Sequence, residues 1–165
     1  MHMIAITGNK GGETKSFTSI ALADYCIRRG DRVILSDSEH DSIQATATAI
    51  AVNSGIQPLD VEKPAYPALA AWKLGKTSTG WSDCLDVMAA LGFDEPVTAV
   101  ADTGASQLQA LIDNLPVLSA GIEAGLKASI VFLAGRTEDS TVALTMAGPT
   151  AVEMTAAEMS DTLLL

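Results

Sequence analysis

Basic residues are scarce in this chain: its 165 residues include ten Lys and Arg against twenty Asp and Glu, a formal net charge of −10. A protein that binds DNA without sequence preference needs clustered Lys and Arg to neutralise phosphates. The nearest approaches to such a cluster are Arg28-Arg29 with Arg32 and Lys73 with Lys76. The sequence therefore argues against direct nonspecific binding of DNA.

Long apolar runs are also missing. Segments such as 130–134 are far shorter than the roughly 20 apolar residues that span a bilayer, and no signal-peptide pattern precedes the first expected strand. A helix that docks on anionic lipid needs basic residues on its polar face. The last segment, 150–165, carries three acids and no Lys or Arg. We therefore expect a cytoplasmic protein without membrane contact.

Cysteines number only two, Cys26 and Cys84, and both fall in segments with helical patterns. They are expected to be buried reduced thiols rather than a disulfide. Hydrophobic residues make up 48% of the chain and charged residues 18%, which excludes a disordered protein. A chain of this length suits one domain, covering 1–165, with a sizeable core.

The most informative stretch present is 10–16, Lys-Gly-Gly-Glu-Thr-Lys-Ser, between an apolar run at 3–6 and a helical run at 17–29. A short strand, a glycine turn and a helix N-terminus can hold a phosphate chain through backbone N–H groups. Lys15 can reach the outer phosphates, and the Ser16 hydroxyl can bind Mg²⁺. The alternative is a glycine-rich turn with two solvated lysines.

Two acids follow apolar, β-branched segments. Asp37 ends the run 32–36, and Asp102 ends the run 97–101. In open α/β sheets, ligands lie outside the carboxyl ends of the strands, so Asp37 is expected to project toward the phosphates. The alternative for Asp37 is that it only begins a polar loop, and a single strand that ends in an aspartate is weak evidence by itself.

The loop resembles the deviant Walker A motif, K-G-G-x-G-K-[ST], of the ParA/MinD family of P-loop ATPases. The extra lysine carries the resemblance, and in that family it contacts the nucleotide of the partner subunit, so the resemblance gives Lys10 this role. It also implies ATP and Mg²⁺ as cofactors. The residues expected to hold the nucleotide are Gly11, Gly12, Glu13, Thr14, Lys15, Ser16 and Phe17.

The two acidic segments resemble further motifs of the family. Asp37 and Glu39 fall on the acids of its D-x-D-P-Q switch, although His40 and Asp41 replace Pro-Gln. Asp102 falls on the Walker B aspartate. By resemblance, the metal residues are Ser16, Asp37 and Asp102, and the catalytic residues are Lys10, Lys15 and Asp37, with Asp37 positioning the attacking water.

Thr14 departs from the motif, which has glycine at this position. The turn needs a backbone shape that a Cβ resists, and strain of this kind costs roughly 1–3 kcal/mol. Either the loop takes a different path here, or nucleotide binding is weakened.

Strands alternate with helices along the chain, which predicts a three-layer α/β P-loop fold with a mostly parallel sheet flanked by helices. Because the family usually continues further, this fold could be shortened at its C-terminal end. The expected strands are 3–7, 32–37, 59–61, 97–101 and 129–134. The expected helices are 15–29, 43–52, 69–74, 82–91 with Ser82 as its cap, 107–120 and the tail from 151, while 140–146 fits either type.

The resemblance implies a slow, partner-stimulated ATPase that dimerises around ATP and Mg²⁺. Its expected role is partition of a plasmid or chromosome segment, or maintenance of a conjugative plasmid, with an adaptor or centromere-binding-type protein as partner. Two alternatives remain open. One is a nonhydrolysing nucleotide-binding scaffold, since Glu13 places negative charge near phosphates. The other is an ATP-dependent metabolic enzyme of the dethiobiotin-synthetase type.

Overall fold

A parallel sheet of seven strands organises the chain, in the order β3-β4-β2-β5-β1-β6-β7. The computed structural model describes residues 1–8, 14–37, 46–71, 79–104, 108–133 and 161–164. The strands are β1 (His2–Thr7), β2 (Arg32–Asp37), β3 (Gln57–Pro58), β4 (Ala68–Ala71), β5 (Val97–Asp102), β6 (Lys127–Phe132) and β7 (Asp161–Leu164). The helices are α1 (Lys15–Arg28), α2 (Thr46–Asn53), α3 (Thr79–Leu91), α4 (Leu108–Asp113) and α5 (Leu115–Glu123).

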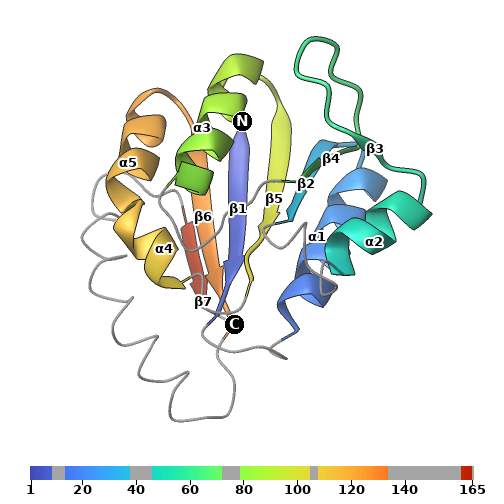
Figure 1. Cartoon of the computed structure of the whole chain (residues 1–165), viewed down its shortest axis with the longest axis horizontal. Helices are drawn as coiled ribbons and strands as arrows, with labels where there is room; N and C mark the ends of the chain where they lie inside the picture. The colour runs from blue at the N-terminus through green and yellow to red at the C-terminus, as the bar shows by residue number, and fades with distance from the viewer. Residues whose placement is uncertain (9–13, 38–45, 72–78, 105–107, 134–160, 165) are drawn as a thin grey trace.

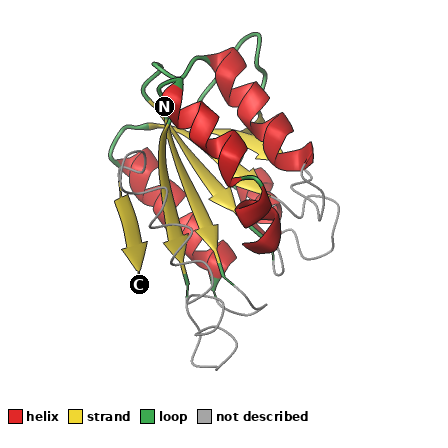
Figure 2. Cartoon of the chain, turned by 90° about the vertical axis from the view of Figure 1, so that its left-hand side faces the viewer, coloured by secondary structure: helices red, strands yellow, loops and turns green. Residues whose placement is uncertain are grey.

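Helices cover both faces of this sheet, as Figures 1 and 2 show. Helices α1 and α2 lie on one face, and α3, α4 and α5 lie on the other. All described strand pairs are parallel. The predicted three-layer α/β fold is therefore confirmed.

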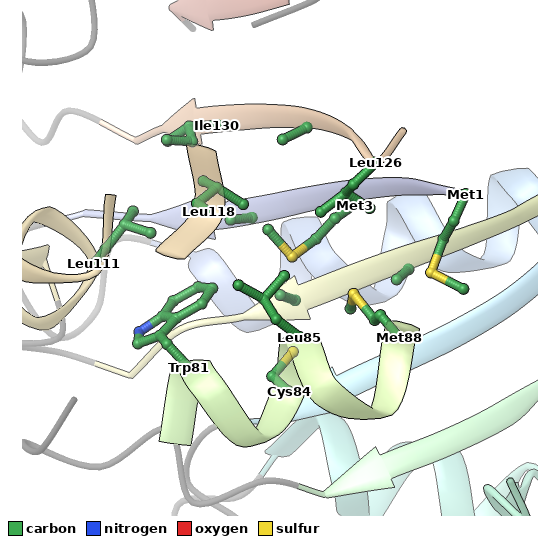
Figure 3. Close-up of a cluster of buried hydrophobic side chains, with 14 of the residues drawn as sticks. Met1, Met3, Trp81, Cys84, Leu85, Met88, Leu111, Leu118, Leu126 and Ile130 are labelled. Carbon is green, nitrogen blue, oxygen red and sulfur yellow. The ribbon is translucent and has the colours of Figure 1, made fainter. Parts of the chain in front are cut away.

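The larger core lies between the sheet and α3, α4 and α5 (Figure 3). Trp81, Cys84 and Met88 of α3 pack there with Met3 of β1 and Leu118 of α5. Trp81 is only 1% exposed, so it is a core residue. A second core, under α1 and α2, contains the other cysteine, Cys26. Both cysteines are free and buried, as predicted.

Most of the predicted strands and helices lie close to the bounds that the sequence indicated. Gly30, expected to end α1, follows it with φ +88°, and Gly92 follows α3 with φ +93°. The cap prediction for α3 was wrong, because the helix begins at Thr79 and Ser82 lies inside it. The short strand expected at 59–61 is instead β3, Gln57–Pro58.

The helix expected at 69–74 was wrong in its described part, since 68–71 form β4. Ala68 pairs with Ile34 of β2, and Leu69 and Ala70 are buried. Burial between neighbouring strands outweighs the helix propensity of Ala and Leu. The helical tail was likewise wrong at 161–164, which form β7 beside β6. Residues 72–74, 140–146 and 151–160 lie outside the described residues.

The single helix expected at 107–120 is two helices, α4 and α5, which meet at Asn114. Pro116 lies in the first turn of α5 and has no N–H to continue the hydrogen bonds of α4. The Asn114 side-chain amide donates to the Ala110 carbonyl at 2.7 Å, which closes the last turn of α4. No described helix is long and apolar enough to cross a membrane.

Candidate functional site

Two acidic side chains meet at the carboxyl ends of β2 and β5. Asp37 and Asp102 are direct partners in the parallel register of these strands, and Asp102 is also opposite Ile6 of β1. Asp37 is 2% exposed and Asp102 is 4% exposed. Buried carboxylates that lie side by side repel one another and need a cation or hydrogen-bond donors nearby.

The first turn of α1 supplies such groups. Lys15 begins the helix and is only 6% exposed, and Ser16 beside it is half-buried. The buried residues of α1 recur at helical spacing, at Lys15, Ser19, Ala23 and Cys26, so this side of the helix faces the sheet. Phe17, expected to contact nucleotide, is 73% exposed at the same helix end.

These neighbours all affect the pKa of the Asp102 carboxyl. Burial raises its pKa to about 6, and the Asp37 charge adds to the rise. Hydrogen bonds from the Ser16 and Ser19 hydroxyls and the Lys15 charge act in the opposite direction on this pKa. Its Oδ1 atom is buried and has no hydrogen-bond partner among the described residues. The structure thus brings Lys15, Ser16, Asp37 and Asp102 together.

The chain after β5 is tied to β1. The Thr103 N–H and its hydroxyl both donate to the Ile6 carbonyl, at 3.1 and 2.7 Å, and Thr103 is fully buried. Gly104 beside it is also buried. These bonds fix the strand end that carries Asp102, and they hold the start of the following loop against β1.

Thr14 adopts a left-handed backbone, with φ 58° and ψ 17°. It is the one non-glycine with positive φ among the described residues. The chain therefore enters α1 with the conformation that glycine adopts without strain, and the threonine side chain carries a cost of roughly 1–2 kcal/mol. The Thr14 carbonyl accepts the first helical hydrogen bond from Thr18 N–H, at 2.8 Å.

Several predicted residues cannot be placed. Lys10, Gly11, Gly12 and Glu13 lie outside the described part of the chain, as do 38–41. Sequence reasoning missed Ser19. Its signal was a serine in the buried stripe of a helix that is otherwise lined on this side by Ala23 and Cys26.

The described side chains fit Mg²⁺. Mg²⁺ prefers oxygen ligands, takes one or two protein carboxylates and keeps several waters. Asp102 offers a buried Oδ1 that has no partner in the described part of the chain, and the Ser16 hydroxyl lies beside the same carboxylate. Among the described residues no group of three or more His, Cys, Asp or Glu could hold a metal ion.

Comparison with known proteins gives a likeness in structure. No model of a protein family matches the chain, and no curated protein matches it. A variant of Cyanothece McdA in complex with ATP superposes with a TM-score of 0.56 at 12% identity, covering 100% of this chain and 68% of that one. Cobyrinic acid a,c-diamide synthase from Mycobacterium smegmatis, with ADP and magnesium, gives 0.52 at 17% identity, covering 99% and 72%.

The signal recognition particle receptor FtsY from Elizabethkingia anophelis gives a TM-score of 0.53 at 15% identity, over 99% of this chain and 49% of that one. These neighbours are SIMIBI-class P-loop NTPases. The chain thus spans about half the length of FtsY and about two thirds of McdA. At such identities the likeness is one of fold.

Proposed function

We propose that this chain binds ATP with Mg²⁺ and hydrolyses it slowly, as a P-loop ATPase of the ParA/MinD kind. One observation carries the proposal: Lys15 and Ser16, at the start of a helix, meet Asp37 and Asp102 at the ends of parallel strands. The fold of ATP- and ADP-bound neighbours supports it. A helix N-terminus beside strand ends is the usual place for a phosphate in such folds.

Each residue has a role that follows from its chemistry. Lys15 supplies a fixed positive charge for the γ-phosphate, and Ser16 with Asp102 would hold the metal. Asp37, beside Asp102, would orient the attacking water. Bound Mg²⁺ would neutralise charge on the β- and γ-phosphates. Catalysis in such a site is positioning and electrostatics, so small displacements of these side chains should lower the rate.

The first experiment is calorimetric titration of Mg-ATP into the full chain, with ATP turnover measured alongside. We expect binding that Lys15→Ala weakens by at least about 100-fold, since loss of one charge–phosphate contact costs several kcal/mol in a buried site. Lys127→Ala is the matched control, because Lys127 is exposed at the start of β6. Absence of heat with the wild-type chain would overturn the proposal.

The second part of the proposal concerns assembly. Lys10 would reach the nucleotide of a second copy, so ATP would drive dimer formation, and hydrolysis would release an adaptor or centromere-binding-type partner. Partition of a plasmid or chromosome segment, or maintenance of a conjugative plasmid, is the process that this cycle would serve. The net charge of −10 argues that any contact with DNA comes through that partner.

Sizing by light scattering tests assembly, with and without a nonhydrolysable ATP analogue. We expect a dimer that needs the analogue, and loss of the dimer in Lys10→Ala. Lys63→Ala, in the exposed segment before β4, is the matched control. A monomer under every condition, with nucleotide bound, would reject the dimer while leaving nucleotide binding intact.

A second candidate is an ATP-dependent enzyme that activates a small carboxylate. Its support is the fold of the cobyrinic acid a,c-diamide synthase, which binds ADP and magnesium. Such an enzyme would consume ATP only with its second substrate present. ATP consumption by the chain alone, or with a protein partner, favours the ParA-like function over this one.

A further inference from the structure

A groove of about 460 Å³ opens between α1 and α2, and we call it the α1–α2 groove (Figure 1). Its floor consists of Ala23, Leu35 and Ala51, each at most 3% exposed. Its sides are four isoleucines, Ile20, Ile27, Ile50 and Ile56. The groove exists because the two alanines, where the helices meet, leave space that larger side chains would fill.

An aromatic side chain projects at one end of the groove. Phe17 is 73% exposed, the largest exposed fraction among the large apolar side chains in the described part of the chain. Ile50, on the other helix, is 41% exposed beside the same groove. Single exposed apolar side chains are common, but these two flank a hollow that is itself apolar. One surface therefore carries both a projecting ring and an apolar hollow that is complementary to it.

This surface carries little of the protein's charge. The charged residues that line the groove are Asp24 and Arg28, which pair with 2.7 Å between Oδ2 and Nε. Helix α2 has no charged residue along its length. Because the chain has a net charge of −10, two copies repel one another unless the surfaces that meet are neutral. The groove is such a surface, which favours a second copy over a strongly charged partner.

We propose that the α1–α2 groove is a contact between two copies of this chain related by a twofold axis. In a twofold contact the same patch serves on both sides, so a residue that projects from one copy enters the hollow of the other, and the reverse. Phe17 is the residue that enters, and Ile50 is part of the hollow that receives it.

This contact goes beyond the ATP-dependent dimer of the proposed function, because it needs neither nucleotide nor metal. It involves few residues, so it should be weak, with a dissociation constant in the micromolar range or above. At low protein concentration the chain without nucleotide should therefore remain a monomer.

Sedimentation velocity of the full chain in EDTA, without nucleotide, tests the contact from low micromolar to submillimolar concentration. We expect a monomer at the lowest concentrations and a reversible dimer at the highest. Phe17→Glu and Ile50→Glu should each raise the dissociation constant of the dimer at least about tenfold, because each places a carboxylate in an apolar contact. Both side chains are exposed, so both variants should fold, which circular dichroism checks.

Two controls separate the apolar contact from a general effect of charge. Val117→Glu adds the same charge on α5, where Val117 is 37% exposed on the opposite face of the sheet. At physiological ionic strength it should change the dissociation constant by less than about twofold, because distant exposed charges are screened. Ile50→Lys brings the net charge closer to zero, yet it should weaken the dimer as Ile50→Glu does, because the contact depends on apolar burial.

Three results would overturn the inference. A chain that stays monomeric at every concentration would leave the groove to a different protein. A dimer that Phe17→Glu and Ile50→Glu do not weaken would lie on another surface. Equal weakening by Val117→Glu would show that charge repulsion, not the groove, controls association.

The proposed function is tested separately. Absence of Mg-ATP binding in calorimetry would reject that function and leave association in EDTA unaffected. A monomer in EDTA that still binds Mg-ATP would reject the contact through the groove alone.

Discussion

The two faces of the sheet differ in chemistry. On the face covered by α3 and α5, the side chains of Met3, Ala99 and Ala101 meet Trp81 and Leu118 in a core that is almost wholly apolar. On the face covered by α1, strands β2 and β5 end in Asp37 and Asp102. The polar side chains of Lys15, Ser16 and Ser19 lie in the first two turns of α1 on the same side of the sheet. Because successive strand residues point to opposite faces, the same strands build both.

This difference indicates that the apolar core under α3 serves stability and that the polar groups beside α1 serve binding. Burying apolar surface stabilises the fold, whereas burying two carboxylates and a lysine lowers stability unless their charges are balanced. Where a structure holds such groups next to a helix N-terminus, a binding role is the natural explanation. Substitutions in the apolar core under α3 should therefore change stability, whereas substitutions of the polar groups at the start of α1 should change binding.

Trp81→Ala should have the largest effect. Trp81 fills the centre of the α3 core, and truncation of a buried tryptophan typically costs about 3–5 kcal/mol. Urea unfolding followed by circular dichroism measures the loss. Val117→Ala on α5, where the side chain is 37% exposed, is the control and should cost less than about 1 kcal/mol. Equal losses in the two variants would contradict the assignment of the core.

The pH dependence of stability should come from Asp102, on the face covered by α1. Burial raises the pKa of Asp102 to about 6, from 3.8. The folded chain then binds more protons than the unfolded chain between pH 4 and 6, so the free energy of unfolding falls as pH rises through this window. The loss from Asp102 is about 3 kcal/mol, complete above pH 6.

Asp102→Asn isolates this effect, because asparagine has the shape of the protonated acid without its titration. Urea unfolding at pH 4, 5, 6 and 7, without nucleotide or metal, should show that the wild type loses stability relative to the variant as pH rises. Asp86→Asn, on the exposed side of α3, should keep the wild-type pH dependence. Parallel curves for Asp102→Asn and wild type would contradict the raised pKa.

Lys15→Ala tests whether the polar groups beside α1 contribute to nucleotide binding rather than to stability. Its loss of Mg-ATP affinity, at least about 100-fold, corresponds to about 2.7 kcal/mol. Leu118→Ala in the α3 core should lower stability by about 2–5 kcal/mol and leave the affinity within about twofold. Measuring both quantities for both variants by urea unfolding and calorimetry gives a crossed pattern. A Leu118→Ala chain that remains folded but loses nucleotide affinity would remove the proposed division between the faces.

Local signals in the sequence were sufficient for much of the fold. The strands that carry the site, β1, β2 and β5, were predicted nearly to the residue, because each is a short β-branched or alanine-rich run between turn residues. Residues 68–71 were not, since only pairing with β2 makes a strand of an alanine- and leucine-rich segment. The break at Asn114 was available from Pro116 two residues later and was overlooked.

The candidate site also has parts that the local sequence predicts and parts that depend on the fold. Asp37 and Asp102 could be named from the ends of their strands, but their direct pairing depends on the strand order, with β5 next to β2. The burial of Ser19 depends on how α1 packs on the sheet, which no local pattern in the sequence states. The sequence also left open whether the loop takes a different path at Thr14 or nucleotide binding is weakened. The backbone of Thr14 is left-handed, as it would be at a glycine, and the effect on nucleotide binding stays a prediction.

The smallest expected effect is at this residue. Thr14→Gly should raise the free energy of unfolding by about 1 kcal/mol, because glycine adopts φ 58° without the steric cost of a β-branched side chain. Gly30→Ala is the mirror experiment. Gly30 ends α1 with φ +88° and has open space around its Cα, so alanine there meets backbone strain alone and should lower stability by a similar amount. Urea unfolding of the two variants and wild type measures both changes. If Thr14→Gly instead destabilises the chain, the threonine side chain makes a contact at the start of α1 that outweighs its strain.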